Sequence, residues 1–222
     1  MLRSESLELG MSVRLALLNY GMGNLHSVRK ALEQAGAQVC DVADGAAWGA
    51  VDGVVLPGVG HFGDGMRELH ARGLAAPLKA WIAADRPLLG ICLGQQLLME
   101  HSEEAPDVAG LGICRGRVVR FQPQDAALKV PHMGWNTFDA RPACPLCRGI
   151  APASQVYFVH SYHVVPDDPA CIGATTEYAV RFCSLLWRGN LFASQFHPEK
   201  SQAVGLAMLR NFVEVVWNCS RQ

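Results

Sequence analysis

A cysteine between two glycines is the residue best placed for covalent chemistry in this sequence. Gly90, Cys92 and Gly94 form a Gly-x-Cys-x-Gly turn between the apolar residues 87–89 and a helix-like stretch at residues 95–100. This order is typical of a nucleophile elbow, with Cys in the place of Ser. The turn sets the thiol at a helix N-terminus, where free backbone N–H groups favour the thiolate. We therefore expect Cys92 to be a nucleophile rather than only a buried cysteine in a glycine-rich turn.

A histidine and a glutamate near the C-terminal end could activate this thiol. His197 ends the strand-like residues 191–196, and Pro198 separates it from Glu199. Residues two apart in an extended segment face the same side, so Glu199 can hold one imidazole nitrogen while the other faces Cys92. A nucleophile, a base and an orienting group are the three parts of a catalytic triad.

A second glycine-rich loop could supply N–H donors to an oxyanion. The apolar residues 54–56 lead into the loop at residues 57–63. Glycines let a backbone approach a ligand closely and present its amides, so Val59 or Gly60 could act together with the amide of Leu93. No Gly-Lys-Ser/Thr follows, which excludes a Walker phosphate loop.

Length and composition predict one domain without a nucleic-acid or membrane partner. The chain has 222 residues, half of them hydrophobic, and a net charge of −1 with no strong basic stripe. No apolar run approaches the roughly 18 residues of a membrane span. Residues 1–10 are polar and acidic, unlike a signal peptide, and Met11 could be an alternative start. We expect a ragged extension at residues 1–12 and a single domain at residues 13–218.

The eight cysteines indicate a reducing, cytoplasmic setting rather than a disulfide framework. Several of them, such as Cys171 and Cys183, lie in apolar strand-like runs and resemble small buried hydrophobes. Cys144 and Cys147 form a lone C-x-x-C in a loop rich in Pro and Arg. A zinc site would need a second pair of ligands, so we expect an exposed loop there and no metal.

Apolar strands that alternate with helices predict an α/β fold. In the first half, the expected strands are residues 13–19, 38–42, 53–56 and 87–91, and the expected helices are residues 25–35, 66–70 and 78–84. From residue 116 onward, short strands follow at 118–121, 156–159, 172–176, 180–187 and 191–195, before a helix at 202–217. The pattern predicts a doubly wound, mostly parallel sheet with helices on both faces and an antiparallel β portion towards the C-terminus.

The Cys and His segments together resemble the class I, or triad, glutamine amidotransferases. More narrowly, the chain resembles the glutaminase subunits of imidazole glycerol phosphate synthase. The narrower resemblance rests on blocks that span nearly the whole chain: Asn-Tyr-Gly-Met-Gly-Asn-Leu at 19–25, Pro-Gly-Val-Gly at 57–60, Pro-His-Met-Gly-Trp-Asn at 131–136, Val-His-Ser-Tyr at 159–162 and Phe-His-Pro-Glu-Lys-Ser at 196–201. His61 departs from the pattern, where a small residue is expected beside the oxyanion loop.

The resemblance implies that glutamine is hydrolysed to glutamate and ammonia through a thioester, with no metal or organic cofactor. Cys92 would attack the side-chain amide, His197 would transfer protons and Glu199 would orient His197. The resemblance also assigns oxyanion and substrate contacts to a wider set: Val59, Gly60, Leu93, Gln96, His160, Ser161 and Tyr162.

The resemblance further implies a partner that receives the ammonia. This would be a (β/α)8-barrel cyclase that forms a heterodimer with the chain and makes imidazole glycerol phosphate and an aminoimidazole carboxamide ribotide in histidine biosynthesis. Asn24, Trp135 and Lys200 match its partner-facing positions. Partner binding would raise glutaminase activity by reorienting the loop at residues 57–60.

Two other functions fit the triad. A glutaminase paired with anthranilate synthase or pyridoxal phosphate synthase would share the elbow and the His-x-Glu segment but should lack the His-Met-Gly-Trp-Asn block at 132–136. A γ-glutamyl peptidase, or another cysteine hydrolase of the same fold, would need no synthase. Activity without any partner would favour that function.

Overall fold

The computed structural model describes residues 13–221. The expected extension at residues 1–12, with its alternative start at Met11, lies outside the described residues. The first half alternates strands and helices: β1 (Val13–Leu18), α1 (Leu25–Gln34), β2 (Ala37–Val42), the 3₁₀ turn η1 (Gly45–Ala47), β3 (Gly53–Leu56), α2 (Phe62–Ala71), α3 (Ala75–Ala83), β4 (Leu88–Ile91) and α4 (Leu93–Leu97).

The second half is mostly β structure, which a long helix closes. Its elements are β5 (His101–Ser102), β6 (Gly116–Arg120), β7 (His132–Thr137), β8 (Asp139–Ala140), η2 (Pro145–Cys147), β9 (Gln155–His160), β10 (Tyr162–Pro166), η3 (Pro169–Cys171), β11 (Ile172–Tyr178), β12 (Val180–Arg188), β13 (Leu191–Ser194), η4 (Pro198–Lys200) and α5 (Gln202–Cys219). Strands β12 and β13 form an antiparallel hairpin that turns at Gly189 and Asn190.

A single large sheet runs through the described part of the chain. Its order is β2-β1-β3-β4-β13-β12-β10-β6-β5, with β11 and β8 joined beside β12. The strands from β2 to β13 are parallel, whereas β12, β10 and β6 continue the sheet in antiparallel fashion. Strands β7 and β9 form a separate antiparallel pair. The predicted fold class, with its antiparallel portion, is confirmed.

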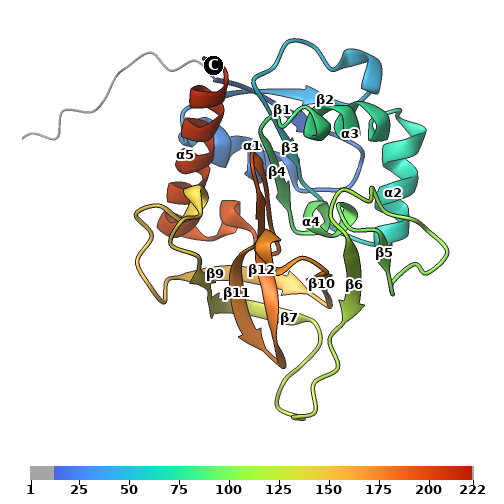
Figure 1. Ribbon diagram of the computed structural model, residues 1–222, viewed down its shortest axis with the longest axis vertical. Helices are drawn as coiled ribbons and strands as arrows, with labels where there is room; N and C mark the ends of the chain where they lie inside the picture. Colours follow the sequence, from blue (N-terminus) through green and yellow to red (C-terminus); the bar gives the residue numbers. More distant parts are fainter. Residues whose placement is uncertain (1–12, 222) are drawn as a thin grey trace, which may run out of the picture.

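Helices cover both faces of the parallel half, and β1 shows why. Its side chains alternate: Leu15 and Leu17 pack into a core with α1 and α5, whereas Ala16 and Leu18 pack into a core with α2, α3 and α4. Figure 1 shows the two helical layers, with α5 on one side of the sheet and α2 and α3 on the other, and the antiparallel strands below them. Both cores leave the carboxyl ends of β3 and β4 at the same edge, where the two glycine-rich turns meet.

Four strands, β5, β7, β8 and β10, lie outside the strands that the sequence predicts. The His-Met-Gly-Trp-Asn block at 132–136 lies in β7, and β10 begins at Tyr162, directly after β9. The helix after the elbow is also shorter than expected, because it ends at Leu97, and α2 begins four residues earlier than Met66. Between residues 13 and 221, no helix has both the length and the apolar character that a membrane crossing requires.

Candidate active site

The backbone at Cys92, the expected nucleophile, has strained geometry. Cys92 lies between β4 and α4 with φ 54° and ψ −109°, a backbone conformation that residues other than glycine rarely adopt. The flanking glycines are sterically required: a Cβ at Gly94 would lie 2.0 Å from the Leu56 carbonyl oxygen, and one at Gly90 would lie 2.9 Å from the Ala193 Cβ. The predicted elbow is therefore present at the carboxyl end of β4.

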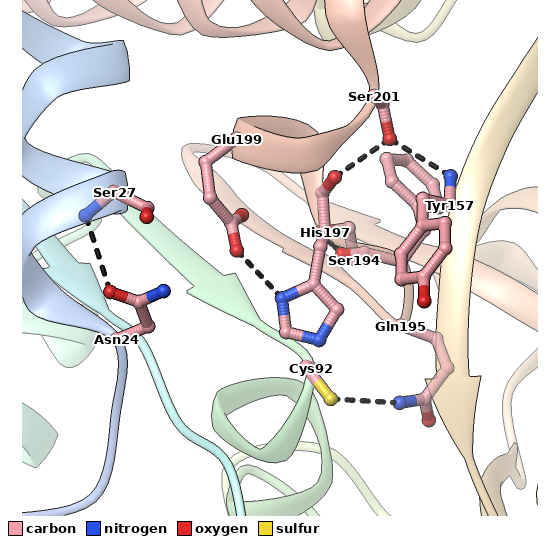
Figure 2. Close-up of polar contacts among 10 residues, drawn as sticks. Asn24, Ser27, Cys92, Tyr157, Ser194, Gln195, His197, Glu199 and Ser201 are labelled. Carbon is pink, nitrogen blue, oxygen red and sulfur yellow. Dashed lines mark hydrogen bonds and ion pairs between the residues drawn. The ribbon is translucent and has the colours of Figure 1, made fainter. Parts of the chain in front are cut away.

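His197 and Glu199 form a buried, hydrogen-bonded pair beside the thiol. The Nδ1 atom of His197 lies 2.7 Å from Glu199 Oε1, and the two side chains are only 3% and 2% exposed. Figure 2 shows the imidazole between Glu199 and Cys92, with its other nitrogen towards the sulfur. Burial opposes the charge, yet contacts with Cys92 and Glu199 raise the pKa of His197 to about 10. An imidazolium at neutral pH stabilises negative charge on the neighbouring sulfur.

A serine that the sequence analysis missed fixes the backbone around this pair. Ser201 Oγ donates to the His197 carbonyl oxygen at 2.7 Å and accepts the N–H of Tyr157 at 3.0 Å (Figure 2). The N–H of His197 donates in turn to the Tyr157 carbonyl oxygen at 3.0 Å. Since Ser201 is fully buried, its hydroxyl ties η4 to β9.

One cavity brings together the residues expected to bind substrate. Its volume is about 400 Å³, and Cys92 lies in its wall. All seven predicted oxyanion and substrate residues line it: Val59, Gly60, Leu93, Gln96, His160, Ser161 and Tyr162. A larger cavity, of about 710 Å³, lies between β8, β11 and the loop after η2, and none of the predicted catalytic residues line it.

The backbone amide expected to hold an oxyanion is already hydrogen-bonded. The N–H of Leu93 donates to the Gly58 carbonyl oxygen at 3.2 Å. The loop at residues 57–60 packs tightly against Tyr20. The Tyr20 hydroxyl donates to the Pro57 carbonyl oxygen at 2.6 Å, and a Cβ at Gly58 would lie 2.4 Å from that hydroxyl. In this conformation Leu93 can receive an oxyanion only after the Gly58 carbonyl turns away.

His61, the departure from the expected pattern, has a structural role. Its Nδ1 accepts the Gly63 N–H at 3.1 Å and so caps α2. Its Nε2 lies 3.1 Å from the Glu104 carbonyl oxygen, and the Glu104 carboxylate accepts the Phe62 N–H at 2.7 Å. Glu104 also lines the substrate cavity. No sequence motif marked this carboxylate, because its place depends on a contact with α2 some 42 positions away.

The three expected partner-facing residues have different surroundings. Trp135 is 45% exposed and packs edge-to-face against Tyr157, with ring centroids 5.9 Å apart. Lys200 is exposed and its Nζ lies 5.8 Å from the same tyrosine ring. Asn24 is exposed too, and its side chain caps α1 by accepting the Ser27 N–H at 3.4 Å (Figure 2). The structure thus brings Trp135 and Lys200 together around Tyr157.

A buried glutamine beside the nucleophile also escaped the sequence analysis. Gln195 Nε2 donates to Cys92 Sγ at 3.7 Å, and Gln195 Oε1 accepts from Gln96 Nε2 at 3.0 Å. Gln195 follows β13, which ends at Ser194, and lies two residues before His197 in the bend that leads to η4.

The C-x-x-C segment was wrongly expected to be exposed. Cys144 and Cys147 are 1% and 9% exposed, and Asn211 on α5 donates to the carbonyl oxygens of Leu146 and Arg148 at 2.8 and 2.9 Å. Leu146 itself is buried and anchors the loop to the helix. Over residues 13–221, no group of three or more His, Cys, Asp or Glu side chains is arranged to hold a metal ion.

Comparisons with known proteins agree with this geometry. The family model described as glutamine amidotransferase class-I matches residues 16–216. A protein from Synechococcus sp. (strain JA-2-3B'a(2-13)), named imidazole glycerol phosphate synthase subunit HisH, is 51% identical over 94% of this chain and 96% of its own length. A protein of the same name from Geobacter sulfurreducens is 45% identical over 91% of this chain and 99% of its own.

Solved structures share the fold at low sequence identity. A crystal structure titled glutamine amidotransferase superposes with a TM-score of 0.71 at 17% identity and covers 91% of this chain and 98% of its own. A structure of PurLQS from Thermotoga maritima gives a TM-score of 0.70 at 16% identity, over 95% of this chain and 99% of its own.

Proposed function

The chain belongs to the class-I glutamine amidotransferase family and, within it, to the family of the HisH subunits, and from this premise we propose that it is the glutaminase subunit of an imidazole glycerol phosphate synthase. The observation that carries the proposal is the buried His197–Glu199 pair beside a strained cysteine at the wall of a cavity. Relatives with almost the same length supply the name of the complex.

The proposed reaction has two covalent stages. Cys92 sulfur attacks the side-chain amide carbon of glutamine, and His197 gives its proton to the departing nitrogen, so that ammonia leaves and a γ-glutamyl thioester forms. His197 then takes a proton from water, which attacks the thioester and releases glutamate and the thiolate. Glu199 holds the imidazole in the orientation that both proton transfers need. No step requires a metal or an organic cofactor.

Polar side chains in the cavity suit an amino acid. Gln96, His160, Ser161 and Tyr162 line the cavity together with Val59 and Gly60, and we propose that they bind the substrate. Glu104 lines the same cavity, and its carboxylate would be the partner of the α-ammonium group. Its contact with the Phe62 N–H leaves further lone pairs of the carboxylate free for the ligand.

The oxyanion site requires a rearrangement of the loop. We place the oxyanion between the N–H of Leu93 and an N–H of the Val59–Gly60 segment. The bond from Leu93 to the Gly58 carbonyl oxygen at 3.2 Å occupies one of these donors, which predicts low glutaminase activity for the free chain. Partner binding would turn the Gly58 carbonyl away and raise the rate, since an oxyanion donor contributes about 10²–10³ in kcat.

The proposed partner is a (β/α)8-barrel cyclase that binds over the mouth of the cavity as a heterodimer. Exposed apolar side chains gather near this mouth: Val59 is 40% exposed, Met133 is 62% exposed and Trp135 is 45% exposed. Strand β7, which carries the last two, pairs with β9, whose end lines the cavity. Lys200 and Asn24 would add polar contacts at the rim. Such a cover would conduct ammonia into the partner and exclude water.

The source of nitrogen tests this function. The chain is mixed with a purified barrel cyclase and the phosphoribulosyl imidazole-carboxamide substrate, and imidazole glycerol phosphate is measured with either glutamine or an ammonium salt. We expect glutamine to support the reaction only when the chain with Cys92 intact is present, and ammonium to support it without the chain. Product formation from glutamine with Cys92→Ala, or none with the unmodified chain, would overturn the proposal.

A further inference from the structure

Two buried histidines have proton positions that their neighbours determine. Asn136 Nδ2 lies 3.3 Å from His132 Nε2, and because an amide nitrogen only donates, His132 Nε2 accepts. The Asn136 oxygen is already used by the Thr137 N–H at 2.8 Å, which fixes the orientation of the amide. His132 therefore carries its proton on Nδ1, which donates to His160 Nε2 at 2.9 Å. His160 then carries its proton on Nδ1.

This polarity continues to a single backbone oxygen. His160 Nδ1 donates to the Tyr162 carbonyl oxygen at 2.7 Å. Both rings are buried, at 3% and 5% exposure, and burial lowers the pKa of His132 to about 4 and that of His160 to about 3. Both histidines are thus neutral near pH 7, as the directed chain requires.

The same backbone oxygen connects the histidines to the nucleophile. The Tyr162 carbonyl oxygen also accepts from Gln96 Nε2 at 3.2 Å, and Gln96 Nε2 donates its second hydrogen to Gln195 Oε1 at 3.0 Å. Gln195 Nε2 then donates to Cys92 Sγ at 3.7 Å, as Figure 2 shows. A continuous hydrogen-bond chain therefore runs from Asn136 on β7 to the sulfur of Cys92.

We propose that Gln195 orients the Cys92 sulfur and stabilises its thiolate, and that His132, His160 and Gln96 are positioning residues that fix the Gln195 amide with its N–H towards the sulfur. This inference rests on the proposed function only in so far as Cys92 is the nucleophile. Gln96 donates to Gln195 Oε1 and so determines which end of the Gln195 amide faces Cys92. The His160 contact with the Tyr162 carbonyl oxygen fixes, in turn, the acceptor on which Gln96 depends.

The physical effect is that of an N–H donor on an anion. Hydrogen bonds to charged groups contribute more than neutral ones, and the Gln195 side chain is fully buried. The sulfur then has the imidazolium of His197 on one side and the Gln195 amide on another (Figure 2). Two fixed contacts hold the sulfur in one position, whereas a single contact would leave it free to rotate about the Cα–Cβ bond.

The test measures thiolate reactivity without any substrate. The full-length chain is alkylated with iodoacetamide across a pH series, and the Cys92 peptide is followed by mass spectrometry. We expect Gln195→Met to lower the Cys92 alkylation rate at pH 7 about tenfold. Gln195→Glu, which keeps the shape and the acceptor for Gln96, should lower the rate further because its carboxylate repels the thiolate.

A neighbouring glutamine provides the matched control. Gln95 is also fully buried, and its Nε2 donates to the Ala193 carbonyl oxygen at 2.9 Å, away from the sulfur. Gln95→Met therefore removes an equivalent buried hydrogen bond, and we expect the alkylation rate to stay within twofold of the parent chain. Equal rates for Gln195→Met and the parent chain, or equal losses for the two Met variants, would overturn the proposal.

The histidines at the far end of the hydrogen-bond chain have their own test. His160→Phe keeps an aromatic ring among Phe121, Phe158 and Phe182 but removes both hydrogen bonds, so we expect an alkylation rate about threefold lower. The control is His163→Phe, because His163 packs on two of the same rings but is not part of the hydrogen-bond chain.

The double variant of His160→Phe with Gln195→Met should react no more slowly than Gln195→Met alone, since His160 acts through Gln195. Independent, multiplying losses would contradict the positioning role. A glutaminase assay of Gln195→Met should show lower kcat with KM unchanged. If alkylation depends on Gln195 while the chain hydrolyses no glutamine with any cyclase, this inference stands and the proposed function fails. If the chain with the cyclase hydrolyses glutamine while alkylation does not depend on Gln195, the proposed function stands and this inference fails.

Discussion

Replacement of Glu199 by glutamine is the perturbation whose size the structure determines best. Glu199→Gln preserves the shape of the side chain and an oxygen for His197 Nδ1, but it removes a negative charge 2.7 Å from that nitrogen in a site where both side chains are at most 3% exposed. A hydrogen bond to a charged group contributes about 1.5–3 kcal/mol, so we expect glutaminase kcat to fall about 10- to 150-fold.

The loss has a second signature in pH dependence. The Glu199 carboxylate is one of the contacts that raise the pKa of His197 to about 10. Without that charge, burial lowers the pKa of the imidazole, so the imidazolium is lost at a lower pH. The alkaline limb of the Cys92 alkylation profile, which depends on His197, should therefore move to lower pH in Glu199→Gln.

The assay is glutamate release from glutamine by the chain with saturating cyclase, with Tm measured in parallel to confirm folding. A matched control is Glu214→Gln, because Glu214 forms an exposed ion pair with Arg148 and does not line the substrate cavity. Exposed pairs contribute at most about 1 kcal/mol, so this variant should keep its activity. A loss of less than threefold in Glu199→Gln, with the protein folded, would refute the role of Glu199.

Three further outcomes follow from single contacts. Gly94→Ala would set a Cβ 2.0 Å from the Leu56 carbonyl oxygen, where the backbone cannot easily give way. We therefore expect the free energy of unfolding in urea to fall by more than about 3 kcal/mol, or no soluble protein. A Tm equal to that of the parent chain would be inconsistent with the elbow geometry. His132, with a folded pKa near 4 against about 6.5 unfolded, stabilises the fold above pH 6.5, and this stability is lost as the pH falls towards 4; the loss should be smaller by about 1–3 kcal/mol in His132→Phe, measured by urea titration. Ser201→Ala should lower the free energy of unfolding by about 1–3 kcal/mol and lower kcat, because the bonds of its hydroxyl to the His197 carbonyl oxygen and from the Tyr157 N–H are lost; unchanged values of both would exclude that role.

The contact between His197 and Glu199 is observed as predicted, but its geometric reason differs, because Glu199 lies on the 3₁₀ turn η4 and not on an extended segment. The elbow at Cys92 could be predicted because it is encoded locally: its glycines are a steric requirement of one turn. The β–α alternation of the first half could be predicted for the same reason: strands buried on both faces are continuous apolar runs.

Strand β7 could not be predicted, because its alternation is the reverse of the usual one. Its inner side chains include the polar His132 and Asn136, whereas its outer side chains, Met133 and Trp135, are large, apolar and exposed. A pattern of polar side chains facing inwards and apolar ones facing outwards does not indicate a half-buried strand. The exposed face is explained by a partner that covers it, as proposed above.

Gln195 and Glu104 escaped prediction for a different reason. Their roles arise from contacts across 103 and 42 positions of sequence, respectively. The bond from the Leu93 amide to the Gly58 carbonyl oxygen could not be foreseen either. Sequence indicates that both glycine-rich turns lie at the same edge of the sheet, but it does not determine which way a peptide in one of them faces.

The most direct test of the central claim is glutamate release from glutamine by the purified chain, alone and with a barrel cyclase, beside Cys92→Ala. The account predicts slow release by the free chain, in which Gly58 occupies the Leu93 amide, strong stimulation by the cyclase, and no release by Cys92→Ala under either condition. Equal rates with and without the cyclase would contradict the proposed partnership and favour a free-standing hydrolase, and release by Cys92→Ala would contradict the mechanism itself.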